Sequence, residues 1–243
     1  MNLRRIFKRK DEEAPKCSAV IVAGGSSQRM GTDKLMVNLG ALPVLVRTLQ
    51  VFQRSEFVEE IVVVTRAELL EQVAGLVKEY DLSKVSRVVC GGKTRVESAL
   101  AGVSEVDRKA RLIAIHDAAR PLVTEDVILR TVYAARDYNA AVPAVSSADT
   151  LKAVDEKGFV VGTVDRESTV RVQTPQIFRA ELIKGALTKA VRDTLPITDD
   201  CAAIEMMGVK CKTVLGDENN IKLTTPRDML LAAAILKDRG EYI

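Results

Sequence analysis

Short apolar runs alternate with longer amphipathic stretches along the chain as far as residue 145. Five runs rich in valine, isoleucine and alanine have the length of buried strands. They lie at 18–23, 60–65, 86–90, 111–116 and 140–145. Between them, apolar positions recur at helical spacing over 44–54, 67–80, 94–103 and 124–138. This repetition predicts a Rossmann-like, doubly wound α/β fold with a mostly parallel sheet, which binds ligands at the carboxyl ends of its strands.

The alternation breaks after residue 145. Two strand-like runs, TLKAV and FVVGTV, flank the turn sequence DEKG. This pattern predicts a β-hairpin arm over 146–167, inserted in the α/β chain.

The remaining elements return to the α/β pattern. We expect helices over about 179–192 and from Thr198 to near Gly208, a strand at 211–215, and a last helix with Thr225 as N-cap and Pro226 at its first position. No internal repeat or interdomain linker is evident, so we predict that residues 17–243 form one domain.

Composition supports this fold and excludes some partners. A hydrophobic fraction of 47% and a charged fraction of 28% are typical of a globular protein, and 4% aromatics without tryptophan require an aliphatic core. Residues 1–16 hold six basic and three acidic side chains, which account for the whole net charge of +3. We expect them to form a solvated, disordered tail, with an arm that binds a membrane surface or a nucleic acid as the alternative. The neutral remainder lacks the basic face that a nucleic acid polymer requires.

Targeting signals are absent from the printed sequence. No apolar run approaches the ~20 residues of a membrane span, and no apolar segment follows the basic start as in a signal peptide. The four cysteines show no C-x-x-C spacing, which favours free thiols over disulfides or a zinc site. We therefore expect a cytoplasmic protein without a membrane partner.

The first strand runs into glycines and cations, in VIVAGGSSQRMGTDK at 20–34. Glycines at a strand end let backbone N–H groups face an anion, and Arg29 and Lys34 could contact phosphate oxygens. The segment matches neither a dinucleotide fingerprint nor a P-loop. On these residues alone, a phosphate site and an ordinary surface loop remain equal alternatives.

A second polar segment, HDAARP at 116–121, follows the fourth predicted strand. Asp117 is suited to holding Mg²⁺, and Arg120 could reach a phosphate or orient Asp117. The alternative is a helix-capping aspartate beside a surface arginine. His116 is the single histidine, so no histidine-based metal cluster or relay is available.

Three other points carry polar or cationic residues: Thr150 with Lys152, then Arg166, then Lys222. Each alone could equally be part of a solvated face.

Taken together, these segments resemble those of a known enzyme family. The ordered set AGGSSQRMG, HDAARP, DTLK, TVDR, QTPQIF, ITDD and NIKLTTP resembles the 2-C-methyl-D-erythritol 4-phosphate cytidylyltransferase family over about residues 17–236. The resemblance implies transfer of CMP from CTP to methylerythritol phosphate, with Mg²⁺ and release of pyrophosphate. It further implies a homodimer in which the hairpin arm reaches the partner's site.

The resemblance also implies roles for individual residues. Arg29, Lys34 and Lys222 would be the catalytic cations, and Asp117 the metal ligand. The substrates would contact Ala23, Gly24, Gly25, Gly91, Ser98, Asp117, Arg120, Thr150, Arg166 and Thr174.

Rival functions share parts of the pattern. A ribitol 5-phosphate cytidylyltransferase has the same fold but explains HDAARP, DTLK and TVDR less well. A guanylyltransferase would explain AGGSSQRMG but not TVDR or QTPQ. A silent nucleotide-binding subunit would not need Arg29, Lys34, Asp117, Arg166 and Lys222 together.

Overall fold

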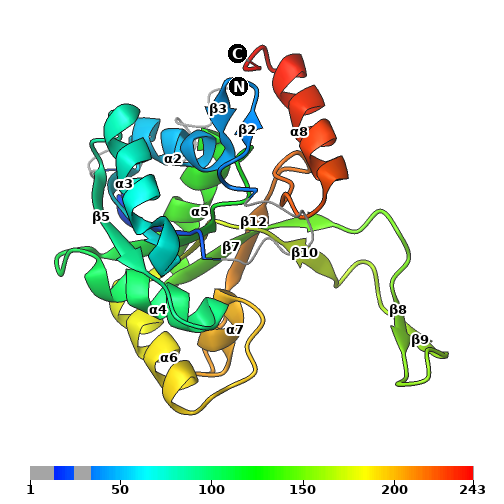
Figure 1. Cartoon of the computed structure of the whole chain (residues 1–243). Coiled ribbons are helices and arrows are strands. Elements are labelled where there is room, and N and C mark those ends of the chain that lie inside the picture. The colour runs from blue at the N-terminus through cyan, green and yellow to red at the C-terminus, as the bar shows by residue number, and fades with distance from the viewer. Residues whose placement is uncertain (1–13, 25–33, 243) are drawn as a thin grey trace.

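The computed structural model describes residues 14–24 and 34–242, and its centre is one eight-stranded sheet (Figure 1). The strands run in the order β10-β7-β11-β6-β1-β4-β5, with β12 also paired to β7. They are β1 (Cys17–Val22), β4 (Val58–Thr65), β5 (Val85–Cys90), β6 (Leu112–Asp117), β7 (Ala140–Ser146), β10 (Val170–Val172), β11 (Gln176–Arg179) and β12 (Lys212–Leu215). The predicted α/β fold and all six strands predicted for this sheet are confirmed.

The sheet is mixed rather than wholly parallel. β1, β4, β5 and β6 pair in parallel, as does β12 with β7. β11 lies antiparallel between β6 and β7, and β10 lies antiparallel on the other side of β7. The sequence analysis missed β10 and β11, because runs of three and four residues show too little periodicity to predict a strand.

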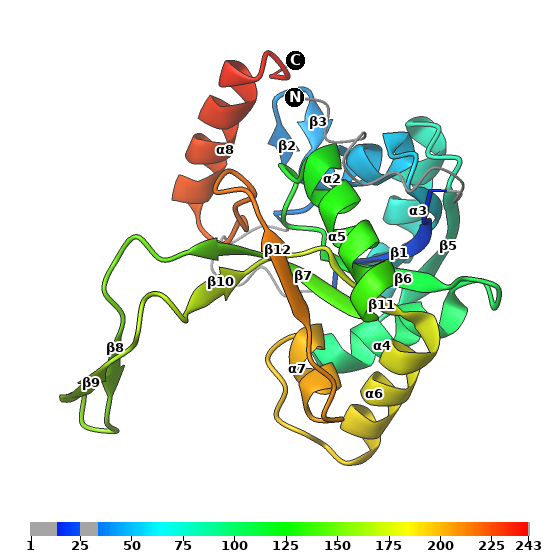
Figure 2. The same ribbon diagram turned by 180° about the vertical axis from the view of Figure 1, so that it is seen from behind.

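The helices form two layers, one on each face of the sheet (Figure 2). The helical elements are α2 (Val44–Arg54), the 3₁₀ turn η2 (Ala67–Leu69), α3 (Leu70–Glu79), α4 (Arg95–Glu105), α5 (Glu125–Tyr138), α6 (Ala180–Arg192), α7 (Asp200–Glu205) and α8 (Pro226–Asp238). One hydrophobic cluster joins α2, α3, α5 and α8 to the sheet, and a second joins α4, α6 and α7 to its other face. This arrangement confirms the doubly wound architecture.

Successive residues of the central strands belong alternately to the two hydrophobic clusters. In β1, Ala19 and Ile21 belong to the first cluster and Val20 to the second. Both faces are buried, so the strand reads as a continuous apolar run in the sequence. Helix α4 approaches this sheet closely at Gly102, where a Cβ would lie 2.4 Å from Val20 Cγ1 and 2.5 Å from Val64 Cγ2. A side chain at position 102 would push α4 away from the strands whose ends build the site.

Helix starts follow the predicted capping chemistry with one correction. Thr225 caps α8 through a reciprocal pair of hydrogen bonds with Asp228, and Pro226 occupies the first position, as expected. Helix α7 was expected to begin at Thr198. Its N-cap is Asp199, whose carboxylate accepts a 2.9 Å hydrogen bond from the Ala202 N–H.

A two-stranded antiparallel hairpin stands at the predicted place, built from β8 (Lys152–Val154) and β9 (Val160–Thr163). It projects from the body of the protein (Figure 1). Phe159 and Val161 are 68% and 64% exposed, so this chain leaves the hairpin's apolar side chains in water. A shorter ribbon, β2 (Asn38–Leu39) with β3 (Leu42–Pro43), precedes α2. Within residues 14–24 and 34–242, no helix has both the length and the apolar character to cross a membrane.

Candidate active site

The strand ends on one edge of the sheet surround a pocket of about 310 Å³. The ends of β1 and β6 lie side by side, because Val22 pairs with Asp117. The pocket is lined by Val22, Gly24, Lys34, Leu35, Gly92, Lys93, Thr94, Arg95, Ser98, Asp117, Ala119 and Lys222. Among these described residues Asp117 is the single carboxylate, against four cations. A pocket of this charge favours an anionic ligand.

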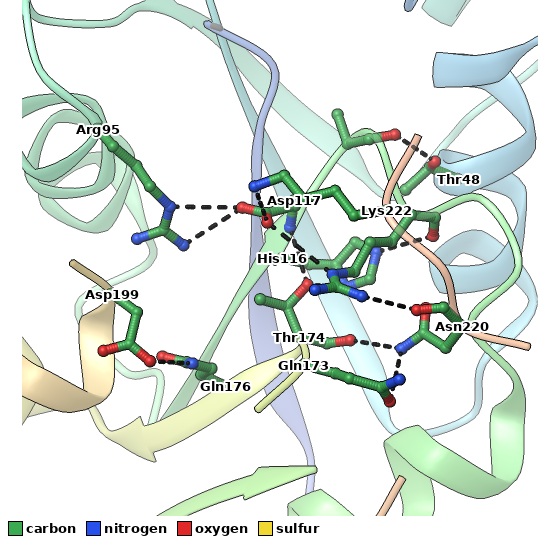
Figure 3. Close-up of polar contacts among 12 residues, drawn as sticks. Thr48, Arg95, His116, Asp117, Gln173, Thr174, Gln176, Asp199, Asn220 and Lys222 are labelled. Atoms are coloured by element: carbon green, nitrogen blue, oxygen red, sulfur yellow. Dashed lines mark hydrogen bonds and ion pairs between the residues drawn. The ribbon is translucent and has the colours of Figure 1, made fainter. Parts of the chain in front are cut away.

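Asp117 lies at the centre of the cations (Figure 3). Its Oδ2 is 2.7 Å from Lys222 Nζ and 3.9 Å from Arg120 Nε, and its Oδ1 is 3.3 Å from Arg95 Nη2. Burial alone would raise the pKa of this carboxyl, but Arg95, Lys222 and Arg120 together hold it well below its usual range. Asp117 is therefore ionised at neutral pH.

Two cations of this pocket, Lys93 and Arg95, were not predicted as site residues, and Arg95 is the one that contacts Asp117. It is the first residue of α4, where the Thr94 capping box orients the helix start. Its guanidinium reaches Asp117 on one side and Asp200 of α7 on the other. Burial would lower the pKa of Arg95, but the Asp200 and Asp117 carboxylates raise it. In the sequence, Arg95 stands three positions after Gly92, and nothing near it indicates a partner. Only the position of α7 shows that this partner is Asp200.

His116 supports Asp117 from behind and stays neutral. It is fully buried, and burial lowers its pKa from 6.5 to about 3. Nε2 lies 3.1 Å from the Arg120 carbonyl, which can only accept, so Nε2 carries the proton of the neutral ring. Nδ1 is then an acceptor, and the Thr174 hydroxyl donates to it at 3.0 Å while accepting from the Asp117 N–H at 3.1 Å. The histidine therefore orients the segment after β6 and does not face the pocket.

A buried asparagine fixes the loop that carries Lys222. Asn220 is 0% exposed, and its amide donates to the Thr174 carbonyl at 2.9 Å (Figure 3). Arg120 donates to the Asn220 carbonyl at 2.7 Å, and the Leu223 N–H donates to the Ala119 carbonyl at 2.8 Å. Arg120 therefore acts beneath the pocket, which favours the orienting role over direct contact with a phosphate.

The glycines bring backbone close to Ser98 on the other side of the pocket. A Cβ at Gly91 would lie 2.6 Å from Ser98 Oγ, and one at Gly92 would lie 2.3 Å from Glu97 Cβ. Ser98 donates to the Thr94 carbonyl at 2.9 Å. A second hollow of about 290 Å³ adjoins the first and shares Gly24, Gly92, Lys93 and Ser98 with it. The two hollows therefore form one continuous depression.

Two motifs of the family resemblance, QTPQ and ITDD, meet at α7. Gln176, in QTPQ, donates to Asp199 of ITDD at 2.8 Å and accepts from the Cys201 N–H at 2.9 Å (Figure 3). This contact joins β11 to the start of α7 and holds Asp200 in reach of Arg95. The residues of both motifs therefore position the cations around Asp117.

The structure brings together some of the predicted site residues and separates others. Lys34, Gly24, Ser98, Asp117 and Lys222 line the pocket, and Gly91 lines the adjoining hollow.

Other predicted residues lie elsewhere. Ala23 is buried, with its N–H bonded to the Val64 carbonyl, and Thr174 faces inward. Thr150 and Arg166 are exposed on the arm and do not line this chain's pocket. Arg29, Gly25 and residues 1–13 of the expected tail lie outside the described residues.

The donor set suits a hard divalent cation. Mg²⁺ is commonly bound by one or two carboxylates together with substrate phosphates and water. Asp117 supplies one carboxylate at the pocket that is ionised at neutral pH, whereas Asp200 is buried and paired with Arg95. One carboxylate is enough for an ion that is also bound by a polyphosphate. It is too few protein ligands for an ion that binds without a substrate.

A doubly wound sheet with a cationic, glycine-lined pocket at its strand ends is the architecture of an α/β nucleotidyltransferase. Comparison with known proteins narrows the class. The family description "2-C-methyl-D-erythritol 4-phosphate cytidylyltransferase" matches residues 17–238, and the chain belongs to this family.

Relatives and solved structures agree with this assignment. Cytidylyltransferases of this name from Caldanaerobacter subterraneus subsp. tengcongensis and Symbiobacterium thermophilum are 40% and 41% identical to the chain. The alignments cover 90% and 92% of this chain and 98% and 94% of those proteins. The crystal structure of 4-diphosphocytidyl-2C-methyl-D-erythritol synthase from Anaerococcus prevotii superposes with a TM-score of 0.82 at 31% identity, covering 93% of this chain and all of that one.

Proposed function

We propose that this protein transfers CMP from CTP to 2-C-methyl-D-erythritol 4-phosphate. A phosphate oxygen of the acceptor attacks the α-phosphorus of CTP, and pyrophosphate leaves, giving 4-diphosphocytidyl-2-C-methyl-D-erythritol. The observation that carries the proposal is the pocket around Asp117, in which Lys34, Lys93, Arg95 and Lys222 surround a single carboxylate. Family membership supplies the choice of substrates.

Positive charge is the main requirement of this reaction. Both reactants are anionic and repel each other, and the transition state at phosphorus spreads further charge over its oxygens. Cations already in place stabilise that charge without reorganising. We assign Lys34, together with Arg29, to the triphosphate and Lys222 to the α-phosphate. Lys222 is 42% exposed at its side chain, so it can exchange its contact with Asp117 for one with the ligand.

No residue of the chain needs to act as a general base. The acceptor's phosphate is already an ionised nucleophile near neutral pH. His116, the single histidine, is buried and neutral and has both ring nitrogens engaged within the protein. Its role in this proposal is to hold Asp117, with Thr174 as the link between them.

We further propose that Mg²⁺ accompanies CTP and that Asp117 is its protein ligand. When bound, the ion would neutralise phosphate charge and polarise the phosphorus centre. The ionised Asp117 carboxylate would contact it directly or through water, and Arg95 would keep the carboxylate oriented.

The remaining substrate contacts are assigned by position. The Gly24, Gly91 and Ser98 side of the depression would hold cytidine, with Ala23 fixing the strand end beneath it and Gly25 extending the loop. Asp117 and Arg120 would serve the methylerythritol phosphate side.

We propose that the protein is a homodimer joined by the hairpin arm. The exposed apolar residues of the hairpin, Phe159 and Val161 among them, would be buried against a second copy, since an isolated two-stranded hairpin is marginal in water. Thr150 and Arg166 would then complete the partner's methylerythritol phosphate site. The free cysteines of the described chain suit the cytoplasm, where we place the reaction.

Pyrophosphate release with matched substrates tests the activity. The purified protein should release pyrophosphate with CTP plus 2-C-methyl-D-erythritol 4-phosphate. Replacing CTP by GTP, or the acceptor by ribitol 5-phosphate, should lower kcat/KM by at least about a hundredfold, since a site built to pair polar groups rejects a ligand that leaves them unpaired. Equal or better turnover of ribitol 5-phosphate would assign the chain to the rival reaction. Turnover with neither acceptor would support a silent nucleotide-binding subunit.

A further inference from the structure

Two cysteines that are ten positions apart in the sequence meet beside helix α7. Cys201 lies on α7 and Cys211 directly precedes β12. Their sulfur atoms and a carboxylate oxygen of Glu205 all lie within 4.8 Å of one another. The Cys201 thiol donates to Glu205 Oε1 at 3.3 Å. None of the three residues lines the pocket around Asp117.

The spacing of these atoms suits a common ion. Zinc binds a cysteine sulfur at about 2.3 Å and a carboxylate oxygen at about 2.1 Å, so two sulfurs at tetrahedral angles on one ion lie about 3.8 Å apart. The three atoms here lie within 4.8 Å of one another, so ligation requires an approach of about 1 Å at most.

The three residues differ in how far they are exposed to solvent. Cys201 is 5% exposed, Cys211 is half-buried and Glu205 is exposed. An ion could therefore enter from the Glu205 side and reach sulfur ligands that are shielded from bulk water. The open side leaves room for a water molecule as the fourth ligand of a tetrahedral site.

We propose that Cys201, Glu205 and Cys211 form a binding site for a thiophilic divalent cation of the zinc type. Two thiolates select zinc over magnesium, because soft sulfur ligands disfavour hard cations. Each thiol releases its proton on binding, so affinity rises with pH. The site is separate from the magnesium proposed at Asp117, which is assigned to an oxygen ligand.

The bound ion would tie the end of α7 to the start of β12. Cys201 follows Asp200, the partner of Arg95, and its N–H is held by Gln176. An ion that crosslinks 201 and 211 would stabilise the segment that fixes Asp200. Because the ion binds the folded chain, it should raise the midpoint of thermal unfolding, and the rise should grow with the logarithm of the ion concentration above Kd.

Direct metal binding to the full chain tests the proposal. Zn²⁺ would be titrated into the reduced protein against a chromophoric chelator, and Co²⁺ would serve as a spectroscopic probe. We expect one tight site per chain and a thiolate-to-cobalt charge-transfer band. Cys201→Ser and Cys211→Ser should each weaken binding by at least the roughly 10- to 100-fold that loss of an outer-shell partner costs. Glu205→Gln, at an exposed position that folding tolerates, should weaken it by a smaller factor.

Cys90→Ser is the matched control, because Cys90 is an exposed thiol on β5 outside the cluster. It should bind Zn²⁺ as the wild type does. Unchanged affinity in Cys211→Ser, or loss of the tight site in Cys90→Ser, would overturn the proposal. A cobalt spectrum without thiolate charge transfer would overturn it as well. Circular dichroism of each variant separates loss of ligand from loss of fold, and catalytic activity plays no part in the readout.

Discussion

Arg95 and Asp200 form a two-point ion pair across two helices, with Nη1–Oδ1 and Nη2–Oδ2 distances of 2.9 and 2.7 Å. Asp200 is 1% exposed, so the pair is shielded from solvent on the side of α7. The same guanidinium contacts Asp117 at the pocket. A buried carboxylate outside the pocket therefore decides where an active-site cation points.

We expect Asp200→Asn to destabilise the protein by about 3 kcal/mol, because it leaves the Arg95 charge without its buried partner. Arg95→Gln alone should have a similar effect, and the double variant should lose less than the sum by at least about 1 kcal/mol. Urea unfolding of the four proteins measures this coupling. Asp193→Asn, which removes an exposed ion pair with Arg192, is the control and should change stability little. Additive effects of the two buried substitutions would contradict the proposed pairing.

Lys34→Ala should reduce kcat far more than it raises KM for CTP. The ammonium is assigned to charge that develops in the transition state, and loss of one such contact commonly costs ~3 kcal/mol, on the order of a hundredfold in rate. Steady-state kinetics with varied CTP provides the measurement. Lys78→Ala on α3 removes an exposed lysine far from the pocket and should leave both constants unchanged. An unchanged kcat with only a raised KM would make Lys34 a ground-state binding residue.

Asp117→Asn should remain folded yet require much more Mg²⁺ for turnover, or fail to turn over at any concentration. The substitution keeps the shape but removes the charge assigned to the ion. A magnesium titration of activity at saturating substrates gives the comparison. Asp126→Asn, at an exposed position in the first turn of α5, serves as the control. If Asp117→Asn has the magnesium dependence of the wild type, Asp117 does not bind the metal.

His116 should stay neutral far below its usual titration range. Its pKa is about 3 in the folded chain against 6.5 for a free side chain, since burial disfavours the charged ring. Between these values the unfolded chain binds a proton that the folded chain does not. Folding stability should therefore fall as pH drops from 6.5 toward 3, by about 1.4 kcal/mol per pH unit from this group, and should not depend on it above 6.5.

The single histidine makes this prediction directly observable. The imidazole proton resonance in an NMR titration should not shift between pH 8 and about pH 5, whereas a solvent-exposed histidine would show its full change there. A midpoint near pH 6.5 in the folded protein would show that the ring is accessible to protons and would remove it as the neutral support of Asp117.

The arm can be tested by complementation between subunits. Lys34→Ala and Arg166→Ala proteins should each be nearly inactive. If Arg166 serves the partner's site, a mixed dimer has one site with both lesions and one with none. Random pairing makes half of the dimers mixed, so coexpression should restore roughly a quarter of wild-type activity. Differential tags on the two chains verify that mixed dimers form. Activity near zero in verified mixed dimers would place Arg166 in its own subunit's site.

The amino-acid sequence by itself determined the architecture and the edge of the sheet that carries the site. Strands such as β1 and β4, buried on both faces, read as unbroken apolar runs, and the polar segments that follow them must meet where parallel strands end. Gly24 and Asp117 could be assigned to one pocket for this reason, whereas Ser98 and Lys222 were assigned to it by the family resemblance. Each signal is local, because it depends on residues within one element and the turn after it.

Only the tertiary structure decided which long-range partners hold that pocket in shape. Arg95 and Asp200 are 105 positions apart, and Thr174 lies 58 positions from His116, so no periodicity connects them. The antiparallel insertion of β11 between β6 and β7 turns Thr174 inward and places Gln176 at the start of α7. Such contacts depend on which strands lie next to one another in the sheet. The packing of the whole core decides this strand order, so it cannot be read from any single segment.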